Sequence, residues 1–460
     1  MIIMKYIRYI LLIALGVMSS CNFLDVEPNV NGKVRTSEMS EPQDVLNGAY
    51  REMGRTSYYG RNTYVFGDVG TDNIVVRSSG GRFNDNYFNT KNSRTSESVD
   101  DSYDISNQMG QIYRVLNHVN TLIHTAGIED DIKGQSLALR AFLNFDLVRF
   151  YGDVPLVTEP STDLNEVVSS KPANNTAAEI YAQIEKDLTE AKALITNTSS
   201  IKFTLNAVYG LETRVFLTRA LEDSNIDKNT YLQKVIDSYN MITGVSVMEA
   251  GDYVKYFNNK ESAETLYEVI IAGAQSRGSD DLGALYIRSG YGAYTCSPDF
   301  YALFSDDDVR KGVFYLENGL FYINKYAEYD GVVGLSSPKV LRYSEAVLNA
   351  AEAQALLGNT ADAITLTDMI RSKRYATGTA PVSTGLIDDV LAERRLELCF
   401  EGHRMFDLRR NNMDMDLINS DGTARSPKAN IPARDQQFYF PIPQNELNVN
   451  SNLKQINGYE

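Results

Sequence analysis

One stretch, residues 387–410 (IDDVLAERRLELCFEGHRMFDLRR), constrains the fold of this chain more than any other. Apolar residues recur in it at the spacing of one face of an α-helix: Ile387, Leu391 and Leu398. Gly402 is expected to end this helix, because glycine readily adopts the left-handed conformation found at helix C-termini. Arg394 falls on the apolar side of the same helix. A buried charge without a partner is strongly unfavourable, so the fold must bring a carboxylate or a carbonyl group to Arg394.

The same stretch carries an acidic stripe at intervals of four residues, formed by Glu393, Glu397 and Glu401. Two interpretations of its charges are open. In the first, four residues are structural members of a buried, ion-paired helix: Arg394, Glu397, Glu401 and Arg404. In the second, three residues form a catalytic cluster: Glu401, His403 and Asp407. Ion-pair networks are the commoner cause of such clusters, which favours the structural interpretation.

Residues 1–20 have the pattern of a secretory signal peptide. Lys5 and Arg8 give a positively charged start, and residues 9–18 form an apolar core that is too short to span a bilayer. Two serines follow, and Cys21 comes directly after them. This arrangement resembles a bacterial lipoprotein cleavage site and predicts lipidation of Cys21; the alternative is an ordinary signal peptide followed by a chance cysteine. Acyl chains would anchor the protein without crossing the membrane.

Helical periodicity recurs along the chain and predicts a mainly α fold. Helices are expected at residues 41–53, 103–126, 130–151, 176–195, 205–221 and 228–241. Residues 342–374 predict a helical hairpin that resembles a tetratricopeptide repeat. In this hairpin Gly358 stops the first helix, and Asn359 with Asp362 caps the second. We expect about four helix pairs stacked as a scaffold. Long irregular loops and short strands, such as residues 266–273, lie between the helices.

Two regions without helical periodicity, residues 54–101 and 273–300, are rich in tyrosine, glycine and polar residues. Tyrosine combines a flat apolar ring with a polar tip, which suits a sugar ring, and loops on a rigid scaffold commonly carry recognition. We therefore expect the two regions to meet on one face of the helical stack and bind a ligand; the alternative is that their tyrosines only pack the loops. The candidate ligand-binding residues are Tyr58, Tyr59, Tyr64, Asp72, Asn73, Arg82, Tyr87, Tyr286, Arg288, Tyr291 and Tyr294.

Several kinds of chemistry find no support in the sequence. A formal net charge of −16 argues against nucleic acid or an anionic membrane surface as a partner. Three cysteines are too few for a disulfide framework, and the three histidines are too scattered for a metal site. No nucleophile elbow or phosphate-binding loop is present. We therefore expect no cofactor, metal ion or catalytic residue. The absence of tryptophan argues against a broad polysaccharide-stacking platform.

Three segments carry a resemblance to a known family: ERRLELCFEGHRMFDLRR at 393–410, RAFLNFDLVRFYGDVPLV at 140–157 and PIPQNELNVNSNLKQ at 441–455. Their types and order resemble those of the SusD/RagB family of outer-membrane nutrient-uptake lipoproteins. The resemblance implies a single SusD-like domain over residues 21–460, with an N-terminal portion to about residue 225 and a C-terminal portion from about residue 226.

The resemblance also implies a function. The protein would be a lipid-anchored, cell-surface glycan-binding protein of the outer membrane that delivers an oligosaccharide to a SusC-like TonB-dependent transporter and performs no chemistry. Three alternatives remain open at this point. The chain would otherwise be a peptide-binding uptake lipoprotein of the RagB type, a surface glycoside hydrolase, or a tetratricopeptide interaction protein whose only partner is the transporter.

Overall fold

The computed structural model describes residues 41–77, 103–161, 169–258, 264–376, 380–418 and 430–459. The expected signal peptide and three candidate residues, Cys21, Arg82 and Tyr87, fall outside these ranges. The chain divides into two compact units. The smaller comprises residues 1–39 and 161–170, and the larger comprises residues 40–160 and 171–460. All helices and strands named below belong to the larger unit.

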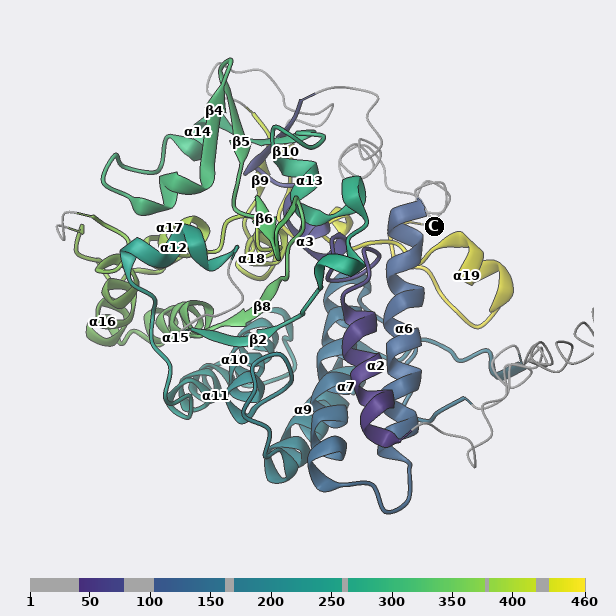
Figure 1. Cartoon of the computed structure of the whole chain (residues 1–460). Helices are drawn as coiled ribbons and strands as arrows, with labels where there is room; N and C mark the ends of the chain where they lie inside the picture. Colours follow the sequence, from purple (N-terminus) through teal and green to yellow (C-terminus); the bar gives the residue numbers. More distant parts are fainter. Residues whose placement is uncertain are drawn as a thin grey trace, which may run out of the picture. The chain divides into compact units, whose positions relative to one another are not determined.

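Four long helices pack side by side in one part of this unit (Figure 1). They are α2 (Pro42–Met53), α6 (Tyr103–Ile123), α7 (Asp130–Tyr151) and α9 (Ala177–Leu194). Helix α7 packs against both α6 and α9, and from Ile132 onward it is almost entirely buried. Gly152 ends α7 with a positive φ of 70°, as glycine at this point predicted. Helix α9 begins with a capping box between Thr176 and Glu179.

A second group consists of α10 (Leu205–Glu222), α11 (Lys228–Asn240), α15 (Tyr343–Leu357) and α16 (Thr360–Arg371). Helix α10 pairs with α11, α15 pairs with α16, and α15 also packs against α10 and α11. Gly358 ends α15 in the left-handed conformation, so the predicted hairpin is confirmed. Asn359 occupies the predicted N-cap position of α16, but the predicted side-chain cap is wrong. Its side-chain amide instead donates a hydrogen bond backward to Gln354 Oε1 (2.7 Å).

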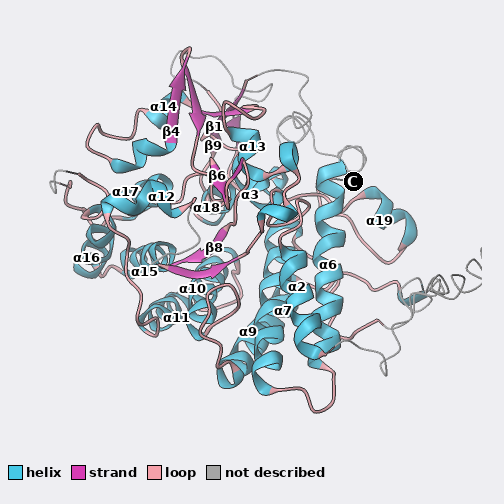
Figure 2. Cartoon of the chain, viewed as in Figure 1, coloured by secondary structure: helices cyan, strands magenta, loops and turns pink. Residues whose placement is uncertain are grey.

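Short antiparallel strands lie above α10, α11 and α15 in the view of Figure 2. One sheet has the order β1-β3-β5-β4, formed by β1 (Ile74–Val76), β3 (Tyr294–Cys296), β5 (Leu320–Ile323) and β4 (Phe314–Glu317). Three two-stranded sheets accompany it: β2 (Thr265–Glu268) with β8 (Lys339–Arg342), β6 (Glu328–Tyr329) with β7 (Val332–Val333), and β9 (Met415–Asp416) with β10 (Asn430–Ile431). The predicted mainly α fold with irregular loops and short strands is therefore confirmed.

Shorter helices connect these groups: α3 (Asn62–Asp68), α12 (Tyr253–Tyr256), α13 (Leu282–Tyr286), α14 (Pro298–Tyr301), α17 (Ile387–Glu397), α18 (Arg404–Arg410) and α19 (Gln444–Val449). Helices α3 and α19 were not expected from the sequence. Pro443 is the N-cap residue of α19, and its position at the start of a helix is favourable because proline has no backbone N–H that would be left without a partner. Across the described ranges, no helix is both long enough and apolar enough to cross a membrane.

Candidate functional site

Helix α17 buries its charged face rather than its apolar one. Val390, Glu393, Arg394 and Glu397 are buried in it. Of the three residues of the predicted apolar face, Leu398 is buried, whereas Ile387 and Leu391 are only partly buried, so the prediction is confirmed only at Leu398. The helix also ends at Glu397, not at Gly402, and residues 398–402 form a turn.

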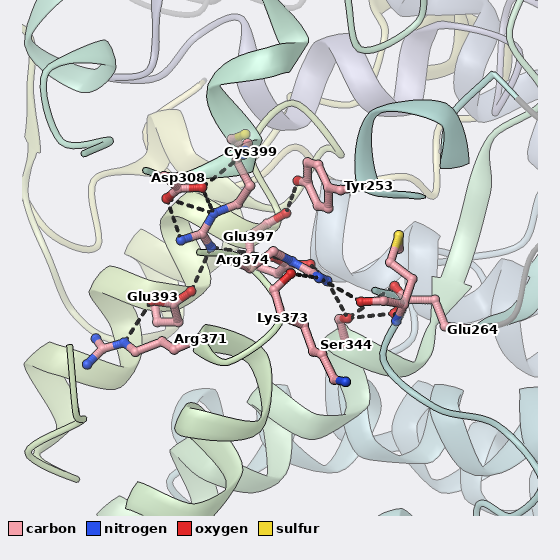
Figure 3. A network of polar contacts seen from close by, with 12 residues as sticks. Tyr253, Glu264, Asp308, Ser344, Arg371, Lys373, Arg374, Glu393, Glu397 and Cys399 are labelled. Carbon is pink, nitrogen blue, oxygen red and sulfur yellow. Dashed lines mark hydrogen bonds and ion pairs between the residues drawn. The ribbon is translucent and has the colours of Figure 1, made fainter. Parts of the chain in front are cut away.

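Glu397 is the centre of a buried charge network (Figure 3). Its Oε1 accepts hydrogen bonds from Arg342 (2.7 Å) and Arg374 (2.9 Å). Its Oε2 accepts from Arg374 Nε (2.8 Å) and, at 3.3 Å, from Arg310. Burial alone raises the pKa of the Glu397 carboxyl, but the positive charges of Arg374 and Arg342 outweigh it and hold this pKa well below its usual value. Glu397 is therefore a fixed anion.

The network extends to both sides of Glu397. Arg310 also binds Asp308 (2.8 Å) and Glu393 (2.6 Å), and Glu393 in turn accepts a hydrogen bond from Arg371 Nε (2.9 Å). These groups come from distant parts of the chain and converge on α17 (Figure 3). Every one of them has a charged partner, so the network joins segments together and leaves no group free to react with a ligand.

Glu401 continues the network into the turn after α17. It binds Lys325 Nζ (2.7 Å) and both Nε (2.8 Å) and Nη2 (2.9 Å) of Arg342. Lys325 also donates to the backbone carbonyl of Cys399 (2.8 Å). The ion-paired structural setting expected for Glu401 is therefore present.

Arg394 has the partners that its position required. Its Nε binds Asp407 (2.9 Å), and its Nη1 donates to Asn349 Oδ1 (2.6 Å). Arg404 in α18 makes two hydrogen bonds to Asp72, of 2.8 and 2.7 Å. Asp72 was a candidate ligand-binding residue, but this bidentate pair commits its carboxylate to holding α18.

The alternative catalytic cluster is not assembled. Glu401 pairs with Lys325 and Arg342, and Asp407 pairs with Arg394 and Arg410. His403 is buried, and burial together with nearby arginines lowers its pKa well below the usual value, so it is a neutral side chain. Within the described part of the chain, no hydrogen bond or ion pair joins any two of the three predicted catalytic side chains.

Most of the candidate tyrosines lie in the core. Five of them are at most 2% exposed: Tyr58, Tyr59, Tyr64, Tyr286 and Tyr294. The rings of Tyr58 and Tyr59 pack edge to face at 4.7 Å, and the Tyr58 hydroxyl donates to Asp146 (2.5 Å). Asn73 is also buried and accepts a hydrogen bond from Arg395 (2.8 Å). These side chains are not accessible for stacking against a ligand, so their proposed binding role does not fit the structure.

The two tyrosine-rich regions nevertheless meet, as predicted, in their described parts. Strand β1 of the first region pairs with β3 of the second, with Ile74 opposite Cys296. The pairing continues beyond the strand, because Arg77 N donates to the Ala293 carbonyl (2.9 Å). Side chains at the end of β1 therefore emerge beside the loop that precedes β3.

At this junction lies a group of side chains around the buried Tyr322, which we call the tyrosine–arginine surface: Arg77, Arg288, Tyr291, Tyr315, Glu317 and Tyr322. Tyr291 is 42% exposed and Tyr315 is 45% exposed. Tyr322 lies beneath, nearly buried, and its hydroxyl accepts a hydrogen bond from Arg77 (2.7 Å). Tyr315 is opposite Tyr322 in the β4–β5 pair, and their ring centroids are 6.5 Å apart.

The sequence analysis found Arg288 and Tyr291 but missed the other members of this surface. A signal for two strands of it is present: the segment FYLENGLFYI at 314–323 has an Asn-Gly turn between two apolar runs, which is typical of a β-hairpin. Asn318 and Gly319 both have positive φ, 53° and 77°, as this turn requires. Among the described residues, no group of three or more His, Cys, Asp or Glu side chains is placed to hold a metal ion.

Comparison with known proteins then places the chain. Residues 222–459 match the sequence model of the SusD family. The chain belongs to the SusD family. Residues 22–217 match a second sequence model related to SusD, which is described as "Starch-binding associating with outer membrane".

Individual SusD relatives agree over nearly the whole chain. SusD-like protein P2 of Formosa agariphila is 24% identical over an alignment that covers 99% of this chain and 100% of that protein. A crystal structure of a SusD superfamily protein from Bacteroides thetaiotaomicron has a TM-score of 0.77 and 25% identity, and covers 90% of this chain and 98% of its own. A SusD-like carbohydrate binding protein from Bacteroides vulgatus shares the fold with a TM-score of 0.70, 22% identity and coverage of 90% and 96%.

Proposed function

We propose that this SusD-family chain captures an oligosaccharide at the cell surface and passes it to a SusC-like TonB-dependent transporter. It would be held at the outer membrane by a lipid on Cys21. The description "Starch-binding associating with outer membrane" for the matched N-terminal sequence model supports both the sugar and the membrane. The pattern of residues 1–21 supports the anchor.

The single observation that carries the proposal is the tyrosine–arginine surface. Tyr291, in the loop before β3, and Tyr315, in β4, are both exposed, and an exposed aromatic ring can stack on the apolar C–H face of a sugar. Arg288, whose side chain is 52% exposed, places a hydrogen-bond donor beside them. The β4–β5 hairpin and the loop before β3 hold these groups in one sheet. A rigid scaffold that presents aromatic and polar side chains at a sheet edge is suited to binding without chemistry.

The carboxylates of α17, of the turn after it and of α18 support the proposal that the protein performs no chemistry. Glycoside hydrolysis needs one carboxyl group that can give up a proton and another that can attack or activate water. Glu397, Glu401 and Asp407 are instead paired with arginine or lysine and buried. Each of these carboxylates is therefore held by a cation inside the fold and is not placed to contact a glycosidic bond.

Calorimetric titration of the mature chain, from residue 22 onward, with a panel of oligosaccharides and a panel of peptides tests the proposal. We expect heat of binding from at least one oligosaccharide, none from the peptides, and the same saccharide recovered intact after a long incubation. Binding of peptides alone would favour a RagB-type peptide-binding protein. Shortened saccharide products would show a hydrolase, and binding of neither panel would leave the transporter as the sole partner; each of these results contradicts the proposal.

A further inference from the structure

We infer that the tyrosine–arginine surface takes an anionic saccharide, one that carries a carboxylate or a sulfate ester, and that Arg77 and Arg288 bind its negative group. The inference rests on the proposed function and adds to it the chemical class of the ligand. Four observations carry it: two guanidinium groups at one ring, the lack of a carboxylate partner for Arg77, the exposed pairing of Arg288, and the tight seating of the loop that bears Arg288.

Two guanidinium groups gather at the ring of Tyr322. The Cζ atom of Arg77 lies 5.8 Å from the ring centroid, and the Cζ atom of Arg288 lies 5.9 Å from it. Both therefore lie within the distance at which a cation interacts with an aromatic ring, and the ring helps to fix both side chains. An oligosaccharide of a few rings that lies across this surface can reach both groups. Two positive charges beside one ring raise the local positive potential, which favours the binding of an anion there.

Among the described residues, Arg77 has no carboxylate partner. Its Nη1 donates to the Tyr322 hydroxyl (2.7 Å), and no described acidic side chain pairs with it. The buried arginines Arg310 and Arg342 behave differently, because each binds three carboxylates. In a chain with a net charge of −16, an arginine that is exposed, oriented by a hydroxyl group and unpaired with an acid is suited to an anionic ligand.

Arg288 is paired, but with a partner that a ligand can replace. Its Nε forms an ion pair with Glu317 at the end of β4, where the two side chains are 52% and 33% exposed. Ion pairs between solvent-exposed groups are weak, so a carboxylate or sulfate on a saccharide can compete with Glu317 for the guanidinium group. Glu317 thus marks the position at which the structure already accommodates a negative group.

The loop that carries Arg288 and Tyr291 is seated directly against Tyr322. A Cβ atom on Gly292 would lie only 2.7 Å from Cε1 of the Tyr322 ring, and Gly292 has a positive φ of 48°. Only glycine permits this approach without displacing the ring. The close seating keeps Arg288 and the exposed Tyr291 in fixed positions relative to Tyr322 and Arg77, which is the preorganisation that a recognition site needs.

The test uses the mature full-length chain and three oligosaccharides of equal length: an oligogalacturonate, a sulfated carrageenan oligosaccharide and a neutral cello-oligosaccharide. We expect at least one anionic probe to bind more tightly than the neutral one, and its affinity to fall as salt rises toward about 0.5 M because salt screens exposed charges. The probe that binds identifies the source of the charge, carboxylate or sulfate.

Two substitutions with opposite expected signs sharpen the test. Arg77→Gln should weaken the anionic probe about threefold to tenfold, the range for losing one charged contact at an exposed site, and leave the neutral probe unchanged. Glu317→Gln should strengthen the anionic probe about twofold to threefold, because Arg288 loses its competing partner. Arg51→Gln is the matched control, since it removes an equally exposed arginine from α2. A gain of affinity from Glu317→Gln is not expected of residues that serve only to stabilise the fold.

Four results would overturn the inference. Tighter binding of the neutral probe would contradict the inference that the ligand is anionic, and so would an equal loss of affinity in Arg77→Gln and Arg51→Gln. Both results are compatible with a sugar-binding surface and so with the proposed function. An unchanged or weakened anionic probe in Glu317→Gln would remove the role of Arg288. Failure of every saccharide to bind would contradict both the proposed function and this inference.

Discussion

The backbone carbonyl oxygen of Gly402 lies 2.1 Å from the place that a Cβ atom on Gly67 would occupy. Helix α3 therefore touches the turn between α17 and α18 backbone to backbone. The contact is reciprocal: a Cβ atom on Gly402, which has a φ of 79°, would lie 3.0 Å from the Thr63 carbonyl oxygen. Asp68, next to Gly67, completes the junction by accepting a hydrogen bond from the Gly402 amide. Gly402 is thus required for the close contact between α3 and the turn that joins α17 to α18.

Gly67→Ala should lower the free energy of unfolding by more than about 2 kcal/mol, because a methyl group cannot occupy space held by the Gly402 backbone. Urea denaturation followed by circular dichroism measures it. Gly48→Ala in α2 is the control: no atom lies within 4 Å of its added Cβ. Alanine there should instead raise stability by about 0.5–1 kcal/mol, as expected within a helix. Equal effects of the two substitutions would contradict the proposed steric cause.

Asp68→Asn should change how stability depends on pH. Burial raises the pKa of the Asp68 carboxyl to about 7, and its Oδ1 has no hydrogen-bond partner among the described residues. The folded chain therefore keeps this proton up to about pH 7, whereas the unfolded chain releases it near about pH 4. The folded state binds more protons over this window, so the contribution of Asp68 to stability falls as pH rises from about 4 to about 7.

An asparagine at position 68 does not ionise and removes this loss. We expect Asp68→Asn to gain stability relative to the parent as pH rises, by an amount on the order of 2–4 kcal/mol between about pH 3, which lies below both pKa values, and pH 8. The difference between the two proteins isolates Asp68, because His403, whose pKa is lowered by burial, contributes equally to both. Urea titrations at several pH values supply the comparison, and a pH-independent difference would contradict the assignment.

Glu397→Gln should destabilise the fold by about 2–4 kcal/mol, because three buried arginines lose their shared anion. The lowered pKa of Glu397 fixes the sign of its pH dependence. Its stabilisation is present above the unfolded pKa, near about 4.5, and is lost as pH falls through the lower folded value. The parent should therefore lose stability in acid more steeply than the variant. Glu249→Gln, which breaks an exposed pair with Lys373, is the control and should have almost no effect.

The helical scaffold was predictable because its signals are local. Gly152 and Gly358 end helices through their own backbone conformation, and the Thr176 cap needs only Glu179, three residues away. The burial of α17 was not predictable in the same way. Its periodicity placed Ile387 and Leu391 inside, yet the carboxylates are inside because arginines from distant segments meet them. A single helix sequence does not show which partners the rest of the fold will supply.

The candidate site, like the scaffold, was predictable from the sequence only in part. The meeting of the two tyrosine-rich regions was predictable from their composition, but the orientation of each ring was not. Tyrosine occurs in the core both with a partner for its hydroxyl, as Tyr58 has in Asp146, and without one among the described residues, as at Tyr286. The residue type alone therefore does not show whether a ring is buried or exposed. Tyr315 was missed because the Asn-Gly turn that creates its hairpin was not used.

Cys21→Ala should leave the protein folded and release it from the membrane, because the predicted lipid attaches to that sulfur. Membrane fractionation should be done in cells that lack the partner transporter, so that binding to the transporter does not retain the variant. A thermal unfolding curve equal to that of the parent serves as the control for folding. Continued presence of the variant in the membrane fraction of such cells would disprove the lipid anchor.

Tyr315→Ala should weaken oligosaccharide binding and leave stability almost unchanged. The ring is 45% exposed, so its removal leaves little buried surface unfilled. Loss of a stacked ring should weaken affinity by about 0.5–1.5 kcal/mol, which is about twofold to tenfold.

Tyr58→Phe is the comparison variant, and the opposite pattern is expected of it. It removes a buried hydroxyl that binds Asp146, so it should lower stability by about 1 kcal/mol and leave binding unchanged. Calorimetric titration and thermal unfolding of both variants separate the two roles. If Tyr58→Phe weakens binding at unchanged stability while Tyr315→Ala does not, the ligand lies in the interior near α7, and the tyrosine–arginine surface is not the site.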